Sequence, residues 1–268
     1  EMLADESAGR LTISDQVITV DSAATISVDT ANLLEATTTG VVTASIDVTE
    51  TVDELNTLTG TNGAYTIVVA AGDATTTTAA DLNTLNGKTT VAVNLTNVTA
   101  LAGSSLSDLE TLASAITLNE FSNDDGLTTI AVTDTTIDAT TLASTIDNYD
   151  TISGGATTGM TLVSGVSINV DASEITEMLA DESAGRLTIS DQVISVTGAT
   201  TVDNANLLGA TTTGKLTATI DTSETVTELA TLSADGGTND LTIVIRAADA
   251  TASTAAQLNT INDATALA

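Results

Sequence analysis

The stretch EMLADESAGRLTISDQVI occurs twice in the chain, at Glu1–Ile18 and again at Glu177–Ile194. The agreement extends to Val20 and Val196, with Thr19 against Ser195 as the only difference. A near-identical copy at a fixed distance is typical of repeat proteins, in which like units pack on one another. This duplication constrains the fold more than any other feature, because one local structure must suit both copies.

The match between the two copies continues through most of the second one. Asp29–Gly40 returns as Asp203–Gly214, and Tyr65–Asn86 returns as Leu241–Asn262. The offset between matching residues is 176 at both ends and 174 in the middle, which indicates small loop insertions. We therefore predict one long repeat of about 175 residues over 1–176, followed by a partial second copy over 177–268.

A shorter unit recurs within the long repeat. It opens with an aspartate, continues with apolar residues three or four apart and a glycine-containing turn, and ends with a run of β-branched residues. Openings of this kind stand at Asp47, Asp73, Asp138, Asp171, Asp221 and Asp249. Their spacing centres on about 25 residues, within the range of roughly 20–50 residues that is typical of solenoid repeats.

Each half of the short unit has a predicted conformation. The apolar spacing over Thr49–Leu58 predicts a short helix, with Asp47 or Thr49 as its N-cap. Runs such as Tyr65–Val69 and Leu241–Ile245 predict short strands, because they are rich in β-branched residues. Positive φ angles at helix ends or tight turns are expected at the glycines between helix and strand, which are Gly40, Gly60, Gly63, Gly87, Gly126, Gly185 and Gly214.

A strand and a short helix cannot bury an apolar face alone, but stacked copies can. The apolar material is almost entirely small and aliphatic, since the aromatic residues are only Phe121, Tyr65 and Tyr149. Such side chains suit thin, regular layers. The predicted fold is therefore a repeat solenoid with parallel strands and short helices, an α/β solenoid that runs as one continuous segment over 1–268. An all-β parallel β-helix is the alternative. Threonines on the outer strand face are expected to form hydrogen-bonded rows between coils.

Charge excludes two classes of partner. Acidic residues outnumber basic ones by 36 to 5, which gives a formal net charge of −31. Nucleic acids and anionic membrane surfaces are both bound through lysine and arginine, so neither is an expected partner. The apolar runs are also too short to span a bilayer.

Catalysis is not expected. The chain contains no histidine and no cysteine, so the common nucleophile pairs and zinc sites are unavailable to it. A pair of carboxylates could still cleave a polysaccharide, and that alternative requires several carboxylates gathered in a groove.

One loop has the composition of a cation site. Asn123, Asp124 and Asp125 offer adjacent oxygens, and Gly126 permits a turn, so this loop is a candidate Ca²⁺ site. An exposed Asx turn accounts for the same residues. The six opening aspartates are interpreted as helix caps or turn residues, with a Ca²⁺-binding ladder of carboxylates as the alternative. No other cofactor is expected.

Two phrases carry a resemblance to a known family. ATTTGKLTATIDTSETVTELATL, at 210–232, and TAADLNTLNGKTTVAV, at 78–93, resemble repeats of the giant cell-surface proteins of marine cyanobacteria. Those proteins include the one associated with swimming in marine Synechococcus. The resemblance implies a secreted, surface-attached, filamentous or envelope role and supplies no catalytic residues.

Together these features predict a structural role outside the cell or on its surface. We expect a segment of a giant secreted repeat protein that forms a filament or surface layer, with itself as partner through end-to-end or lateral assembly. A chain that starts and stops within repeats is interpreted as a slice of a longer protein. The alternative function is the spacer stalk of a bacterial adhesin.

Overall fold

The computed structural model describes residues 2–60, 62–152, 159–233 and 238–266. These residues form a mixed α/β structure of short helices and several parallel sheets. Every strand pairing with a stated register is parallel, and no sheet within the described ranges is closed. The predicted combination of parallel strands with short helices is confirmed. The all-β alternative is wrong, because helices separate most of the strands.

Contacts divide the chain into two compact units. Unit 1 holds residues 1–131 and 148–158, and unit 2 holds residues 132–147 and 159–268. The boundary does not coincide with the boundary between the two sequence copies, which lies at 176 and 177. One continuous segment over 1–268 stays a prediction, and each unit is described by itself.

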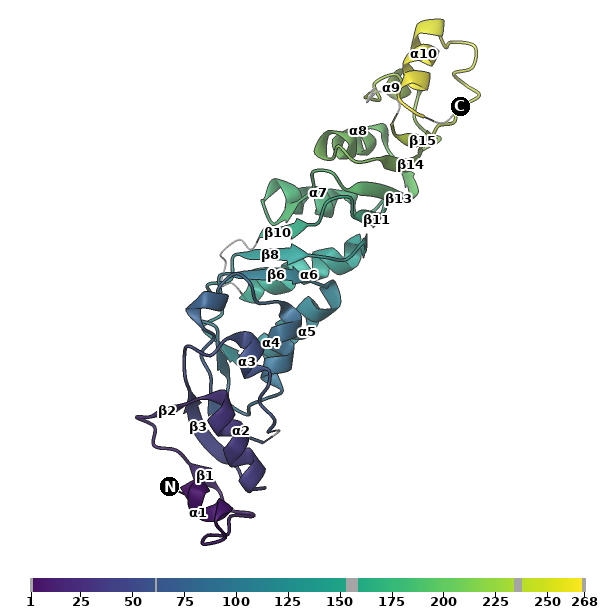
Figure 1. Cartoon of the computed structure of the whole chain (residues 1–268). Helices are drawn as coiled ribbons and strands as arrows, with labels where there is room; N and C mark the ends of the chain where they lie inside the picture. The colour runs from purple at the N-terminus through teal and green to yellow at the C-terminus, as the bar shows by residue number, and fades with distance from the viewer. Residues whose placement is uncertain (1, 61, 153–158, 234–237, 267–268) are drawn as a thin grey trace. The chain divides into compact units, whose positions relative to one another are not determined.

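Unit 1 alternates short strands with helices (Figure 1). Its elements in chain order are α1 (Met2–Ser7), β1 (Ile18–Thr19), β2 (Thr25–Ile26), α2 (Val28–Thr37), β3 (Val42–Ile46), α3 (Val52–Leu55), β4 (Ala64–Thr66), the 3₁₀ helix η1 (Ala71–Asp73), α4 (Ala79–Asn86), β5 (Val93–Asn94), β6 (Ala100–Ser104), α5 (Leu106–Thr117), β7 (Phe121–Ser122) and β8 (Thr129–Val132), whose last residue belongs to unit 2. Both β1 and β2 pair with one edge of β3, and β4 pairs with its other edge.

Unit 2 has the same alternation and contains the longest sheet. Its elements are β9 (Thr136–Asp138), α6 (Ala139–Ile152), whose last residues belong to unit 1, β10 (Gly159–Leu162), β11 (Ser167–Asp171), α7 (Ile175–Ser183), β12 (Leu187–Thr188), β13 (Val193–Thr200), α8 (Val202–Thr211), β14 (Leu216–Ile220), α9 (Val226–Leu229), β15 (Asp240–Thr242) and α10 (Ala255–Asp263). Five strands pair in the order β15-β14-β13-β11-β9, and β12 pairs with β10. Figure 1 shows β11, β13, β14 and β15 following one another in this order.

The core consists of aliphatic side chains from alternate strand positions and from one helix face. In β14, Leu216, Ala218 and Ile220 are buried while the residues between them are exposed. In α4, Leu82 and Leu85 are fully buried, as the spacing of three residues predicts. Strand alternation and helical spacing therefore direct their apolar sides to a common layer.

The helix caps differ from those predicted. The helix over Thr49–Leu58 is confirmed, but it is only one turn long and its N-cap is Thr51, not Asp47 or Thr49. The Thr51 hydroxyl accepts the Glu54 amide, and the Glu54 carboxylate accepts the Thr51 amide, which is a complete capping box. The prediction failed because the helix begins only at Val52, and the Asp47 carboxylate accepts the Thr49 amide and hydroxyl in the turn before it.

At more of these turns, glycine is needed because a side chain would collide with neighbouring atoms than because the backbone has a positive φ. Of the seven predicted to need a positive φ, only Gly185 has one. At Gly40 and Gly214 a Cβ would collide with the backbone oxygens of Gln16 and Gln192 respectively. These two glycines therefore permit close approach between neighbouring backbones in both copies.

Candidate functional site

The most regular feature of both units is the contact between consecutive strand–helix segments. We call this the stacking interface and define a segment as one strand with the helix that follows it. Its first component is backbone pairing, in which Thr43 lies opposite Ala64 in unit 1 and Thr217 lies opposite Asp240 in unit 2. These residues match at the offsets of the two copies, so the same register recurs.

The second component lies at the helix starts. The first amide of a helix has no partner within the helix and lies at its positive end, so it favours an anionic or hydroxyl acceptor. In this protein the next segment supplies that acceptor. The bonds are Val28 N to Glu50 Oε1 at 3.1 Å, Val52 N to Asp73 Oδ2 at 2.8 Å, Ala79 N to Ser104 Oγ at 2.9 Å, Val202 N to Glu224 Oε1 at 3.2 Å and Val226 N to Asp249 Oδ2 at 3.2 Å.

The third component is a ladder of asparagine side chains, of which Asn32, Asn83 and Asn206 lie in helices and Asn56 is the C-cap of α3. Each donates its amide to a backbone carbonyl of the next segment, 25 residues further along the chain. The bonds are Asn32 to Thr57 O at 3.1 Å, Asn56 to Asp81 O at 3.2 Å, Asn83 to Asp108 O at 2.9 Å and Asn206 to Thr231 O at 3.0 Å. An identical step in four places indicates a repeated contact rather than four separate ones.

Threonine hydroxyls also join segments, but not as predicted. Hydrogen-bonded rows between coils were expected from threonines on the outer strand face. Bonds between coils are present, but the threonines that make them include helix C-cap residues, and their hydroxyls donate to backbone carbonyls of the preceding segment. Thr38 donates to Gln16 O at 2.6 Å, and its counterpart Thr212 donates to Gln192 O at 2.7 Å. Gln16 and Gln192 lie just ahead of β1 and β13, outside the strand ladder, and the threonine hydroxyls satisfy their backbone oxygens.

The opening aspartates have two roles. Asp47 accepts the amide and the hydroxyl of Thr49, and Asp171 accepts those of Ser173, so both are turn residues. These bonds hold the pKa of each carboxyl below its usual value. Asp73 and Asp249 instead accept a helix-start amide of the preceding segment. Neither role brings several carboxylates together.

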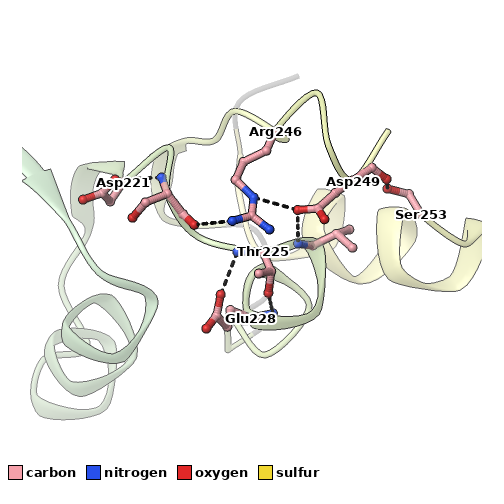
Figure 2. Close-up of polar contacts among 8 residues, drawn as sticks. Asp221, Thr225, Glu228, Arg246, Asp249 and Ser253 are labelled. Carbon is pink, nitrogen blue, oxygen red and sulfur yellow. Dashed lines mark hydrogen bonds and ion pairs between the residues drawn. The ribbon is translucent and has the colours of Figure 1, made fainter. Parts of the chain in front are cut away.

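Arg246 adds a contact that only the second copy has (Figure 2). Its Nε donates to Asp249 Oδ2 at 2.9 Å, and its Nη1 donates to the backbone oxygen of Ser223 at 2.9 Å. The bond to Asp249 raises the pKa of the guanidinium and lowers that of the carboxyl. Because the same carboxylate accepts Val226 N, Arg246 holds it in place for the stacking interface. The first copy has Ala70 at this position.

The duplicated stretch shows how the interface determines burial. Leu187 is 1% exposed and Met178 is 3% exposed, whereas their identical counterparts Leu11 and Met2 are 41% and 39% exposed. In unit 2, β10 covers this stretch, because Met160 lies opposite Leu187 in a parallel pairing. The described part of unit 1 contains no equivalent strand ahead of Leu11. The same side chains are therefore core or surface according to the segment before them.

The candidate calcium loop follows β7. Asn123 has a left-handed φ of 56°, Asp124 is half-buried, and Asp125 is exposed. The backbone of Asp124 accepts the Leu127 amide at 3.1 Å, which closes the turn. Within the described ranges, no group of three or more acidic, histidine or cysteine side chains has a geometry that could hold a metal ion. The calcium site at these three residues stays a prediction.

Comparison with known proteins adds no relative, since no family model, curated protein or solved structure matches this chain. Among the described helices, none combines the length and apolarity needed to cross a membrane.

Sequence reasoning missed the asparagine ladder and the acceptor role of Glu50. A signal was present, because asparagine directly follows a leucine of the helical apolar pattern at Leu55–Asn56, Leu82–Asn83 and Leu258–Asn259. A polar residue fixed beside a core position is informative, since an amide there must find a partner. The arrangement joins consecutive segments of this chain through paired backbone, helix-start amides and asparagine side chains.

Proposed function

We propose that this chain is a structural stretch of an α/β solenoid, a segment of a giant secreted repeat protein that builds an extracellular filament or surface layer. The observation that carries the proposal is the duplicated stretch, whose Leu187 is buried beside β10, while the identical Leu11 is exposed and has no equivalent strand beside it among the described residues. Order that arises from neighbours along the chain is the property of a repeat array. Such order suits a protein that forms a long array by adding further segments.

Composition supports the same role. A formal net charge of −31 opposes clumping, and high salt screens it, since the Debye length falls to about 3–5 Å at the ionic strength of seawater. The stacking interface uses backbone, amide and hydroxyl groups, and carboxylates that accept helix-start amides at hydrogen-bonding distance, and bonds over such short distances are screened little by salt. The proposal contains no catalytic step and no cofactor.

A repeated exposed leucine supports lateral assembly. Leu33 in α2 is 55% exposed, and its counterpart Leu207 in α8 is 54% exposed. Single exposed leucines are common on surfaces, but the same one in both copies gives an array a regular row. The row would let neighbouring solenoids associate side by side.

Electron microscopy and sedimentation of the purified chain at about 0.5 M NaCl test the proposal. We expect filaments or sheets that increase with protein concentration. The double variant Leu33→Asn with Leu207→Asn is expected to reduce lateral assembly. The matched control, Ala36→Asn with Ala210→Asn, changes exposed residues of the same helices and is expected to behave like the parent. Monodisperse particles at every concentration would contradict assembly and favour the spacer stalk of an adhesin.

A further inference from the structure

The last segment of unit 2 presents an open apolar cavity. It has a volume of about 440 Å³ and is lined by Leu241, Thr242, Ile243, Ile245, Leu258, Ile261, Asn262 and Thr265. Leu258 is 40% exposed. The equivalent surface of the first copy indicates which polypeptide fits a cavity of this size.

Every residue that lines the cavity has a counterpart in the first copy. The counterparts of Ile243, Ile245, Leu258 and Ile261 are Ile67, Val69, Leu82 and Leu85, and all four are 0% exposed. They are covered by the segment that begins at Val93. Asn94 exchanges backbone bonds with this surface, since Val69 N donates to Asn94 O at 3.1 Å and Asn94 N donates to Ile67 O at 3.0 Å. Helix α5 packs on α4 beside it.

The polar groups of the two surfaces match as well. In the first copy Ala79 N donates to Ser104 Oγ at 2.9 Å, and Asn83 donates its side-chain amide to Asp108 O at 2.9 Å. Their counterparts are Ala255 and Asn259. Within residues 238–266 and the other described ranges, the amides of Ile245 and Ala255 have no hydrogen-bond partner. The apolar cavity and the free amides are thus the two halves of one stacking interface.

We infer that the cavity of the last segment is a docking surface for a polypeptide segment with the sequence of Val93–Thr117 of this chain. The occupant is a strand that pairs with Ile243–Ile245, followed by a helix that covers α10. This inference rests on the proposed solenoid and deepens it, because it names the residues through which the array is extended. Its specificity comes from the buried side chains of Val93 and Leu95 and from the Ser104 hydroxyl of that segment.

The test extends the full chain at its carboxyl end with a copy of residues 93–131. Ala268 corresponds to Ala92, so the added residues follow in the natural register. Residue-resolved hydrogen exchange by NMR is measured on the original and extended chains. We expect exchange at the Ile245 and Ala255 amides to slow at least about tenfold in the extended chain. A matched extension with Val93→Asp and Leu95→Asp in the added copy is expected to leave both amides as in the original.

The amides of Val69 and Ala79 keep this test separate from that of the proposed function. If they are protected while Ile245 and Ala255 still exchange freely in the extended chain, the docking inference is overturned and the solenoid is not. If Val69 and Ala79 also exchange freely, internal stacking itself has failed. Equal protection by the aspartate-bearing extension would overturn the inference, as would concentration-dependent protection in the original chain, which would make an intact second copy the occupant.

Discussion

The two copies of the duplicated stretch have the same side chains but different surroundings. In the first copy Asp5 and Arg10 form an ion pair whose side chains are 38% and 69% exposed. In the second copy Asp181 and Arg186 form the same pair, and the side chain of Asp181 is only 3% exposed. Arg186 also reaches Asp147 at 3.5 Å, from the segment before it. The difference shows that contact with a preceding segment changes this ion pair from an exposed one to a largely buried one.

The strands at the end of the duplicated stretch also differ between the two copies, in length and in the number of strands with which they pair. In unit 1, β1 and β2 are two residues each, and among the described strands they pair only with β3. In unit 2, the corresponding strand β13 is continuous over eight residues and pairs with β11 on one edge and β14 on the other. The second copy is also two residues shorter between Val196 and Val202 than the first is between Val20 and Val28. Pairing on both edges and the shorter connection together favour one strand over two.

The largest effect expected from this comparison concerns Leu187 and Leu11. Leu187→Ala creates a cavity in the core of unit 2 and should destabilise it by about 2–5 kcal/mol. Leu11→Ala removes an exposed side chain and should cost well under about 1 kcal/mol. Urea denaturation, together with hydrogen exchange at amides near each site, measures the loss of stability in both variants. Equal losses would contradict the difference in burial between the two copies.

A second expectation concerns the ion pairs. Asp181→Asn leaves the Arg186 guanidinium beside a neutral group in a largely buried site, so we expect a loss of about 1–3 kcal/mol in the free energy of unfolding. Arg186 is 27% exposed, which keeps the loss below that of a fully buried pair. Asp5→Asn is the matched variant, and it should cost no more than about 1 kcal/mol. A larger loss from Asp5→Asn would reverse the comparison.

Much of the fold could be predicted from local sequence. The short helices and the strands rich in β-branched residues follow from composition and spacing within ten or so residues. Burial of Leu82 and Leu85 follows from helical spacing in the same way. Strand lengths were overestimated, because the run at Leu241–Ile245 forms a strand only over Asp240–Thr242.

Contacts between segments could not be predicted from local sequence. The bond from Val28 to Glu50 joins residues 22 apart, and the ladder bond from Asn32 to Thr57 joins residues 25 apart. Both depend on the register in which one segment lies on the next. Repetition reveals that a register exists, but not which side chain faces which backbone group. The different exposure of Leu11 and Leu187 is the extreme case, since identical residues cannot predict two outcomes.

The smallest expected effect comes from a pair that the two copies do not share. The Tyr65 hydroxyl donates to Glu35 Oε1 at 2.6 Å, and the second copy replaces these residues together, by Leu241 and Gly209. Because a buried hydroxyl needs an acceptor, the two positions should be coupled. In a double-mutant cycle of Glu35→Ala and Tyr65→Phe, we expect a coupling energy of about 1 kcal/mol at pH 7. Additive losses would show that the paired replacement has another cause.

The pH dependence of stability in the alkaline range distinguishes the hydrogen bond between Tyr65 and Glu35 from simple packing. Burial, together with the bond to Glu35, raises the pKa of Tyr65 above its ordinary value of 10.0. The folded state therefore keeps a proton that the unfolded state loses, so stability is fully present below pH 10 and falls as the pH rises further. Burial raises the pKa of Tyr149 as well, and its contribution persists in every variant of Tyr65. The fall above pH 10 should thus be smaller in Tyr65→Phe than in the parent, but not absent. An unchanged fall would assign the alkaline sensitivity to Tyr149 alone and remove Tyr65 from the comparison of the copies.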